Sequence, residues 1–404
     1  MRYIIGLILI LFGSFADIFL FKMGIIPVQP SSFLIPFFLV ICAVKYPIVE
    51  IIEVCKSHTF KIFAIFIFLA IIFATISPAA SNIIIEEIVS NIITILLYVY
   101  MVQFFRSESK FLIFLVCFGA FAVLAISVWY DYFVGLPKFS KAAEAMVRKG
   151  GFGENPNQAA SGLKFLALAI LIFLQNNKFN RVFFIIVMFF SVFMTFSRSG
   201  IISVVLLLIF GTSNGWVSKF NITHQKLVKS IFKMILLFTS LYITLVMLVG
   251  VLRSEFPELG RGAMGNRIDL LLGKSEKSVI AEDIGTGGGR GDLVLKFLDD
   301  FKQNPLGYGT AYTSDQRYNN LNTHNIYLFL AVNFGIIALL LYFLYLIKSI
   351  RLSFTHNQFY YLIFIILLMF EGLVTHHLFF NRSILITLAF FDSLLYINSN
   401  KKQV

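Results

Sequence analysis

Long apolar runs separated by short polar segments make up most of the chain. Twelve such runs can be distinguished, at about 3–21, 28–44, 60–77, 83–104, 111–129, 159–175, 182–196, 200–216, 231–252, 324–347, 358–375 and 383–398. Most of them approach the ~20 residues that an α-helix needs to cross a bilayer. We therefore predict an all-α membrane protein with about twelve transmembrane helices.

The second run is the least regular of the twelve. It contains Pro36 and follows Pro27 and Pro30, and a proline inside a helix removes a backbone donor and bends the chain. We expect this run to be tilted or partly re-entrant.

The composition agrees with a membrane protein. Hydrophobic residues make up 58% of the chain, charged residues only 13%, and the mean hydropathy is +0.86. No soluble core needs that much apolar surface. The net charge of +12 could indicate nucleic-acid binding. Basic residues that collect in cytoplasmic loops explain this charge better, so we predict no nucleic-acid partner.

The distribution of basic residues predicts the orientation of the chain. An even number of spans places both termini on one side, and the termini and loops of that side carry sixteen Lys and Arg. The four short loops on the other side carry only Lys22, Arg198 and Arg382. Since cytoplasmic loops are enriched in Lys and Arg, we expect a multi-pass protein with cytoplasmic termini.

Two segments on the outer side are long enough to carry a function. The larger, at about 253–323, separates membrane helices one to nine (1–252) from helices ten to twelve (324–404). The smaller, at about 130–158, contains four basic residues that run against the usual charge bias: Lys138, Lys141, Arg148 and Lys149. We interpret this charge as a candidate for holding an anion.

The larger outer loop contains one amphipathic segment, GDLVLKFLDDFKQN. Its apolar residues recur at helical spacing, at Leu293, Phe297, Phe301 and, on the neighbouring flank, Leu298. Pro305, Gly307 and Gly309 follow the segment and are expected to end it. We predict a helix that lies against the membrane domain or at the membrane interface.

His324 is the strongest candidate for acid–base chemistry. It lies between Thr323 and Asn325 at the outer mouth of the tenth run. A neutral imidazole in partial contact with water could take a proton from a hydroxyl, and Asn325 or a nearby carboxylate could fix its tautomer. The alternative is an interfacial histidine beside a helix cap.

Two arginines are candidates for binding an anion. Arg198 lies between two apolar runs, where a lone Arg is expensive unless it faces a wet cavity or an anion. The alternative is an arginine that snorkels to the surface. Arg290 follows a stretch with four glycines in five residues, which lets the backbone approach a bulky anion closely. The alternative for these glycines is a flexible linker.

Other charged groups give weaker signals. Asp17, Glu86 and Glu87 lie near the ends of apolar runs, where they can simply face water. A proton-coupled transporter needs acidic groups at mid-membrane depth in several helices, and only Asp17, Lys164 and Glu371 come close. The neighbours His376 and His377 would point in different directions on a helix, which makes them a poor metal pair. We predict no metal site and no cofactor.

Four stretches of the chain carry a resemblance to a known family. They are Gly151-Phe152-Gly153-Glu154-Asn155-Pro156-Asn157, Thr195-Phe196-Ser197-Arg198-Ser199-Gly200, Gly289-Arg290 with Asn304-Pro305-Leu306-Gly307-Tyr308-Gly309, and His324-Asn325-Ile326-Tyr327-Leu328 running to Phe334-Gly335. In their order and spacing, these motifs resemble the O-antigen ligase and polymerase family of bacterial membrane glycosyltransferases.

The resemblance implies a reaction on the periplasmic face of the inner membrane. Members of the family transfer a glycan from undecaprenyl pyrophosphate to a sugar hydroxyl, without a metal and with inversion. Ligases use the lipid A–core as acceptor, and polymerases use another lipid-linked glycan. By this resemblance Arg198 and Arg290 bind the donor pyrophosphate, and His324 is the base or at least orients the acceptor hydroxyl. We expect Asn325, Arg267, Asn157 and Arg148 as supporting residues, with Arg267 as an alternate phosphate ligand.

One departure from the family pattern concerns the histidine. Asn333 stands where the family often has Glu, and such a Glu could tune the pKa of His324. We expect ligase activity ahead of polymerase activity, because twelve spans with one dominant late outer loop resemble the ligase branch. The competing hypotheses are a transporter of lipid-linked sugars and a non-catalytic membrane scaffold.

Overall fold

The computed structural model describes residues 1–139, 149–174, 177–212, 290–319, 321–376 and 378–400, with six isolated helical positions between 232 and 247. Every regular element in these residues is helical, so the all-α prediction is confirmed. Eleven of the twelve expected runs coincide with helices in the described part. The run at about 231–252 lies outside it, apart from isolated positions.

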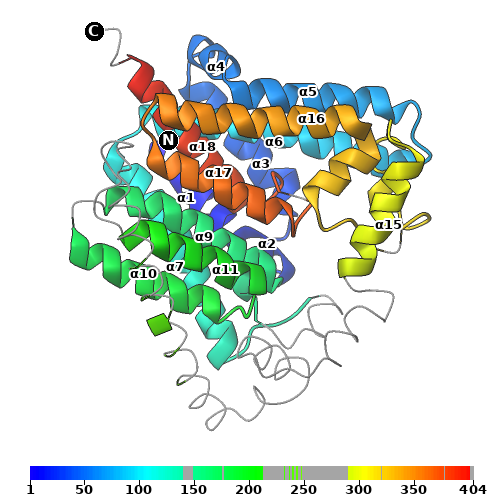
Figure 1. Cartoon of the computed structure of the whole chain (residues 1–404). Helices are drawn as coiled ribbons and strands as arrows, with labels where there is room; N and C mark the ends of the chain where they lie inside the picture. The colour runs from blue at the N-terminus through cyan, green and yellow to red at the C-terminus, as the bar shows by residue number, and fades with distance from the viewer. Residues whose placement is uncertain are drawn as a thin grey trace.

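The helices follow one another as shown in Figure 1. Their bounds are Arg2–Ser14 (α1), Ala16–Lys22 (α2), Pro30–Lys45 (α3), Ile48–Cys55 (α4), His58–Ala74 (α5), Ser81–Ser107 (α6), Lys110–Phe133 (α7), Pro156–Phe173 (α9), Lys178–Phe193 (α10), Arg198–Thr212 (α11), Arg290–Gln303 (α15), Ile326–Thr355 (α16), Phe359–Gly372 (α17) and Arg382–Asn400 (α18). Short 3₁₀ turns occur at Gly151–Gly153 (η1) and Tyr312–Ser314 (η3).

Several helices have the length and composition of membrane spans. Among the described residues, α6, α7, α9 and α16 pass this test alone, and two bent pairs raise the number to six. Helices α5 and α17 are apolar but shorter. The structure therefore supports a multi-pass membrane protein, and it does not confirm the expected count of twelve spans.

The two bent pairs have different local causes. Helices α1 and α2 meet at 74° through Phe15, which adopts a left-handed backbone conformation with φ of 60°. Helices α3 and α4 meet at 112° just before Pro47. The residue before a proline avoids the helical region, so α3 ends there. The expected irregularity of this region is thus present, but it lies at Pro47, and α3 continues through Pro36.

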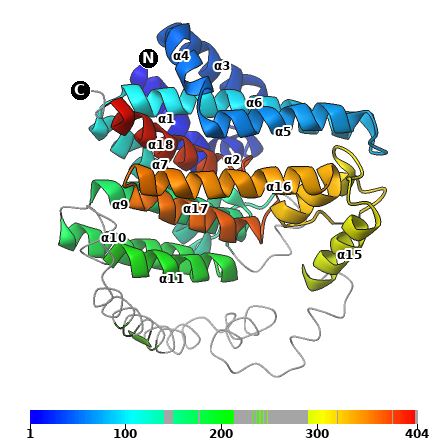
Figure 2. The ribbon, with the colours of Figure 1, turned by 45° about the horizontal axis from the view of Figure 1, so that its top comes forward.

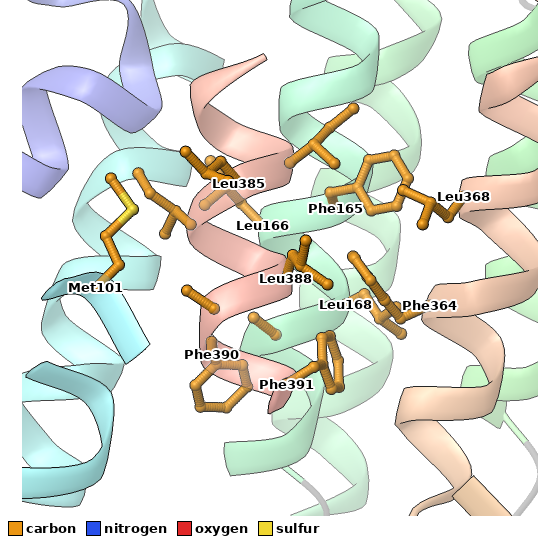
Figure 3. Close-up of a cluster of buried hydrophobic side chains, with 14 of the residues drawn as sticks. Met101, Phe165, Leu166, Leu168, Phe364, Leu368, Leu385, Leu388, Phe390 and Phe391 are labelled. Carbon is orange, nitrogen blue, oxygen red and sulfur yellow. The ribbon is translucent and has the colours of Figure 1, made fainter. Parts of the chain in front are cut away.

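The C-terminal helix α18 lies at the centre of the fold. Figure 3 shows Leu385, Leu388, Phe390 and Phe391 of α18 in a cluster of buried side chains between α6, α9 and α17. The carboxylate of Asp392 is buried among them. It accepts hydrogen bonds from the Tyr98 hydroxyl of α6 at 2.7 Å and from the Tyr361 hydroxyl of α17 at 3.0 Å.

Helix α16 connects this core to the polar end of the molecule. It packs between α5 and α17, and α15 contacts it near its N-terminal end. Figure 2 shows α16 running alongside α5, with α15 beside the bent end of α16. His324 and Asn325, two of the residues expected to carry chemistry, lie at this end, just before the first turn of α16.

Candidate active site at the start of α16

The loop that follows α15 packs against a break in α16 and forms hydrogen bonds with it. Gly335 interrupts the helix with φ of 72° and ψ of −172°, a conformation that favours glycine. The carbonyl of Pro305 accepts a hydrogen bond from Ile336 N–H at 2.9 Å, and Tyr308 N–H donates to Val332 O at 2.8 Å. A Cβ at Gly335 would lie 2.4 Å from the carbonyl oxygen of Leu306. Glycine is therefore required at this position, because a Cβ would clash with the loop.

Asn333 fixes the same loop from inside the helix. Its side chain is buried, and its Oδ1 accepts a hydrogen bond from Thr313 N–H at 3.1 Å. Its Nδ2 donates to Thr313 Oγ1, also at 3.1 Å. The residue that departs from the family pattern thus organises the η3 turn.

The loop is also tied to the connection between α5 and α6. The Ser77 hydroxyl donates to Thr310 O at 2.6 Å, and the Thr310 hydroxyl donates to Ala70 O at 2.6 Å. Asp315 is buried and accepts a hydrogen bond from Ala80 N–H at 2.9 Å. Three separate contacts therefore hold the loop on the C-terminal end of α5 and the segment that leads into α6.

An ion pair stabilises the end of this loop. Arg317 contacts the Asp315 carboxylate at 2.6 Å and also donates to Pro78 O at 3.1 Å. The hydrogen bond from the Arg317 guanidinium holds the pKa of Asp315 well below its usual range. Beside the pair, the rings of Tyr308 and Tyr312 stack with centroids 4.4 Å apart. Burial raises the pKa of Tyr312 to about 12.

His324 immediately precedes the cap of α16. Its backbone has φ of 47°, which is uncommon for a non-glycine residue, and the residue is exposed. Asn325 is the N-cap, and its Oδ1 accepts hydrogen bonds from Tyr327 N–H at 2.9 Å and Leu328 N–H at 3.1 Å. These bonds give Asn325 a structural role and hold His324 at the start of the helix. The proposed effect of Asn325 on the tautomer of His324 stays a prediction.

A second histidine lies against His324. The ring centroids of His324 and His376 are 5.4 Å apart, and the rings meet edge to face. His376 comes from the loop after α17 and is only 7% exposed. Its ring also lies 6.2 Å from that of Phe329 in α16. The catalytic candidate thus has water on one side and a buried imidazole on the other.

Arg198 is the first residue of α11, and three contacts position this helix on α9. Near its start, the Ser197 hydroxyl donates to Asn157 Oδ1 at 2.9 Å and accepts a hydrogen bond from Gly200 N–H at 3.3 Å. One turn further, a Cβ at Gly200 would lie 2.8 Å from Ala160, so the two helices are in close contact. Deeper still, Lys164 donates to Ser203 Oγ at 3.1 Å. Asn157, predicted as a supporting residue, therefore lies beside the start of the Arg198 helix.

Arg290 is the first residue of α15, which confirms the predicted amphipathic helix. Leu293 and Phe297 are buried against Val332 of α16, as the helical spacing indicated. Leu298, on the neighbouring flank of the helix, is exposed. The helix ends at Gln303, shortly before the predicted stop at Pro305. Two other predicted site residues, Arg148 and Arg267, lie outside the described residues.

In the segment at about 130–158, one basic residue forms an ion pair within the protein. Lys138 pairs with the buried carboxylate of Asp131 at 2.6 Å, which leaves it a structural role in place of the expected role toward an anion. Asp131 also accepts hydrogen bonds from Gly150 N–H at 3.2 Å and Gly151 N–H at 3.0 Å. The glycines of this motif therefore close a loop around a buried carboxylate. No pattern in the sequence marks Asp131 as a buried carboxylate.

One carboxylate expected to face water does not: Asp17 is fully buried and pairs with Arg382. Glu87 is half-buried and lines a cavity together with His376, whereas its neighbour Glu86 is exposed. Lys164 and Glu371, noted as potential mid-membrane charges, form an ion pair in which both side chains are buried. These pairs join α2 to α18 and α9 to α17.

The comparison with protein families agrees with the motifs. Residues 183–343 match the family model described as O-Antigen ligase. The matched stretch contains Arg198, Arg267, Arg290 and His324. The resemblance to this family is thereby confirmed, and it supports enzymatic glycan transfer at a membrane in general. No curated protein matches the chain in sequence.

Proposed function

We propose, from the match over residues 183–343 and the geometry around His324, that this protein is an O-antigen ligase. In this proposal it transfers a glycan from undecaprenyl pyrophosphate to a sugar hydroxyl of the lipid A–core. The observation that carries the proposal is the placement of His324: it is exposed, it precedes the cap of α16, and it contacts a buried imidazole.

His324 would act as the base in a single displacement. It removes the proton of the acceptor hydroxyl while the hydroxyl oxygen attacks the anomeric carbon. The bond from that carbon to the pyrophosphate oxygen breaks, and its electron pair leaves with undecaprenyl pyrophosphate. Attack opposite the leaving group inverts the anomeric centre. The exposure of His324 supports this role, because the acceptor can reach it from water.

Arg198 and Arg290 would neutralise the charge that develops on the pyrophosphate. Each is the first residue of a helix, α11 or α15. Helix N-termini carry unpaired N–H groups and a partial positive charge, which favours an anion there. A guanidinium at such a position adds a full charge and a planar pair of donors. This arrangement stabilises the leaving group without a metal.

The reaction would take place on the periplasmic face of the bacterial inner membrane. The charge distribution of the sequence supports cytoplasmic termini. The start of α16 and the α5–α6 connection then face the periplasm. Substrates of this class are lipid-linked, so the bilayer delivers them to the site.

The test is the surface lipopolysaccharide of cells that lack this protein, together with an assay of their undecaprenyl-linked glycan. Cores without glycan and long polymer retained on the lipid carrier are the result expected of a ligase. Cores with a single repeat would instead identify a polymerase. Unchanged lipopolysaccharide would contradict both activities and favour a transporter or another glycan.

A further inference from the structure

A small cavity lies between α5, α6, the start of α16 and the loop after α17, and His376 is part of its lining. It has a volume of about 50 Å³. Most of its lining is apolar, with several phenylalanine rings. Its polar side chains are Glu87, Asn91 and Thr94 from α6 and His376 from the loop. A cavity of this size with polar partners has room for a few water molecules at most.

His376 joins this cavity to the candidate base. Its buried ring lines the cavity and also meets the ring of His324, with centroids 5.4 Å apart. His324 itself is exposed at the surface. His376 therefore separates the catalytic candidate from the interior and contacts both.

Glu87 places a carboxylate in the lining of this cavity. It accepts a hydrogen bond from the backbone N–H of Ala311, which has an unusual φ of 66°. Its Oε1 atom is fully buried and has no hydrogen-bond partner among the described residues. A buried carboxylate oxygen without a partner is costly, and such groups concentrate at functional sites.

We propose that Glu87 is a positioning residue for the base: acting through His376, it stabilises the positive charge that His324 acquires. This inference rests on the proposed transfer reaction. A carboxylate behind an imidazole orients the ring and favours positive charge on the side away from the carboxylate. The lining of the cavity is largely apolar. Water therefore screens the attraction between the carboxylate and the imidazole cation little, and the stabilisation is stronger.

The proton balance needs no further reactant. The acceptor O–H bond breaks and its proton moves to the His324 imidazole, which becomes a cation. During this step no proton moves to or from Glu87 or His376; the ionised Glu87 carboxylate lowers the free energy of the His324 cation through the ring of His376. After the product leaves, exposed His324 returns the proton to water.

The other charged groups around the cavity are few. From α5 and α16 it receives apolar side chains. Helix α6 also carries Glu86, which is exposed. The loop packed on α6 carries Asp315 and Arg317, which pair with each other. Glu371, on the helix that leads to His376, is paired with Lys164. Among the side chains that line the cavity with His376, Glu87 is the carboxylate.

The competing explanation is that Glu87 only anchors the backbone at Ala311. The variant Glu87→Gln separates the two roles. Its amide oxygen still accepts the hydrogen bond from Ala311, and its size is unchanged, but the negative charge is lost. The matched control is Glu86→Gln, the same chemical change at the exposed neighbouring position.

The first measurement is transfer by the purified full-length protein, with an undecaprenyl-pyrophosphate-linked glycan as donor and lipid A–core as acceptor. We expect Glu87→Gln to lower kcat at least about tenfold, with the KM for the donor and the melting temperature unchanged. His376→Phe should lower kcat similarly. The double variant should be no worse than the worse single variant, because both changes interrupt one path. Wild-type kcat in Glu87→Gln would overturn the proposal.

The second measurement does not depend on transfer activity. Diethyl pyrocarbonate modifies neutral imidazole, and mass spectrometry can quantify its reaction at His324. If Glu87 stabilises the protonated ring, His324 in Glu87→Gln should react at least about twofold faster at pH 6, while Glu86→Gln behaves as wild type. Equal rates in all three proteins would sink the inference. A changed labelling rate in a protein with no transfer activity would uphold Glu87 and refute the proposed function alone.

Discussion

The carbonyl of Pro305 accepts a hydrogen bond from Ile336 N–H at 2.9 Å, across the break that Gly335 makes in α16. At this break, a carbonyl of the loop after α15 thereby takes the place of a carbonyl within α16 as hydrogen-bond acceptor. Because His324 immediately precedes the cap of that same helix, the fold of the loop and the position of the base depend on each other.

Gly335→Ala should disrupt this junction. The new Cβ would lie 2.4 Å from Leu306 O, at a backbone φ of 72°. The left-handed conformation alone costs about 1–2 kcal/mol for an L-residue, and the clash adds to it. The matched control is Gly24→Ala, which has φ of 75° but nothing within 4 Å of the new Cβ. The melting temperature in detergent should fall clearly further for Gly335→Ala; equal losses would mean that the clash is relieved without cost.

Asn333 should contribute to stability through Thr313. Asn333→Leu leaves Thr313 N–H buried without its acceptor, a loss of about 1–3 kcal/mol. Thr313→Val removes only the bond from Asn333 Nδ2 and keeps the N–H bond to Oδ1. Unfolding measured by heat or denaturant should therefore rank Asn333→Leu as the less stable variant. The reverse order would show that the side-chain bond is the important one.

The Asp315–Arg317 pair should make stability depend on pH at the acidic end. Since the folded pKa of Asp315 lies below its unfolded value, the pair stabilises the fold fully above the ordinary carboxyl range. This stabilisation should be lost as the pH falls below about 4, through the folded pKa. Asp315→Asn removes the titrating group, so the stability difference between wild type and variant should shrink as the solution is acidified. A difference that stays constant with pH would contradict this assignment.

The buried pair of Lys164 and Glu371 should behave as a structural unit. Lys164→Met leaves the Glu371 carboxylate buried without its partner, which costs about 3–5 kcal/mol. The double variant Lys164→Met with Glu371→Leu replaces both charges by apolar groups and should recover most of the loss. Yield and melting temperature in detergent measure this. Recovery of both stability and glycan transfer in the double variant would exclude a proton-carrying role for the pair.

The proposed chemistry predicts that substitutions at the two ends of α16 differ sharply in their effect on glycan transfer. His324→Ala should abolish glycan transfer while the protein still inserts at the wild-type level, because the base is lost. His356→Ala, at the opposite end of the same helix, should leave transfer unchanged. Cell-surface glycan together with the protein level in membranes provides the measurement. Normal surface glycan in His324→Ala would falsify the assignment of the base.

A parallel pair tests the anion site. Arg198→Ala removes the guanidinium at the first turn of α11 and should abolish transfer without loss of protein. The control Arg351→Ala removes an exposed guanidinium from α16. An Arg198→Ala protein that transfers at the wild-type rate would mean that the donor pyrophosphate is bound elsewhere.

Local signals in the sequence predicted much of this structure. Apolar runs gave the helices, because a span must satisfy its own backbone hydrogen bonds. Ser197 and Asn325 are residues that cap helices, and they place Arg198 and His324 beside helix starts. The spacing of Leu293 and Phe297 predicted the buried face of α15.

Long-range contacts could not be predicted in this way. Nothing near Glu87 marks it as lining a cavity together with His376, since the two residues come from elements far apart in the chain. Lys138 looked like a free charge because its partner Asp131 lies inside an apolar run. The break at Phe15 was missed because bulky residues seldom adopt positive φ, so the sequence carries no sign of it.

The bond between Tyr98 and Asp392 joins residues 294 positions apart. During synthesis, α6 enters the bilayer long before α18 exists, and its tyrosine hydroxyl must find a temporary partner in lipid headgroups, water or the insertion machinery. The core shown in Figure 3 closes only when α18 arrives between helices already in place. The buried hydrogen bonds of Asp392 therefore form only after α18 has been synthesised and has packed against α6 and α17.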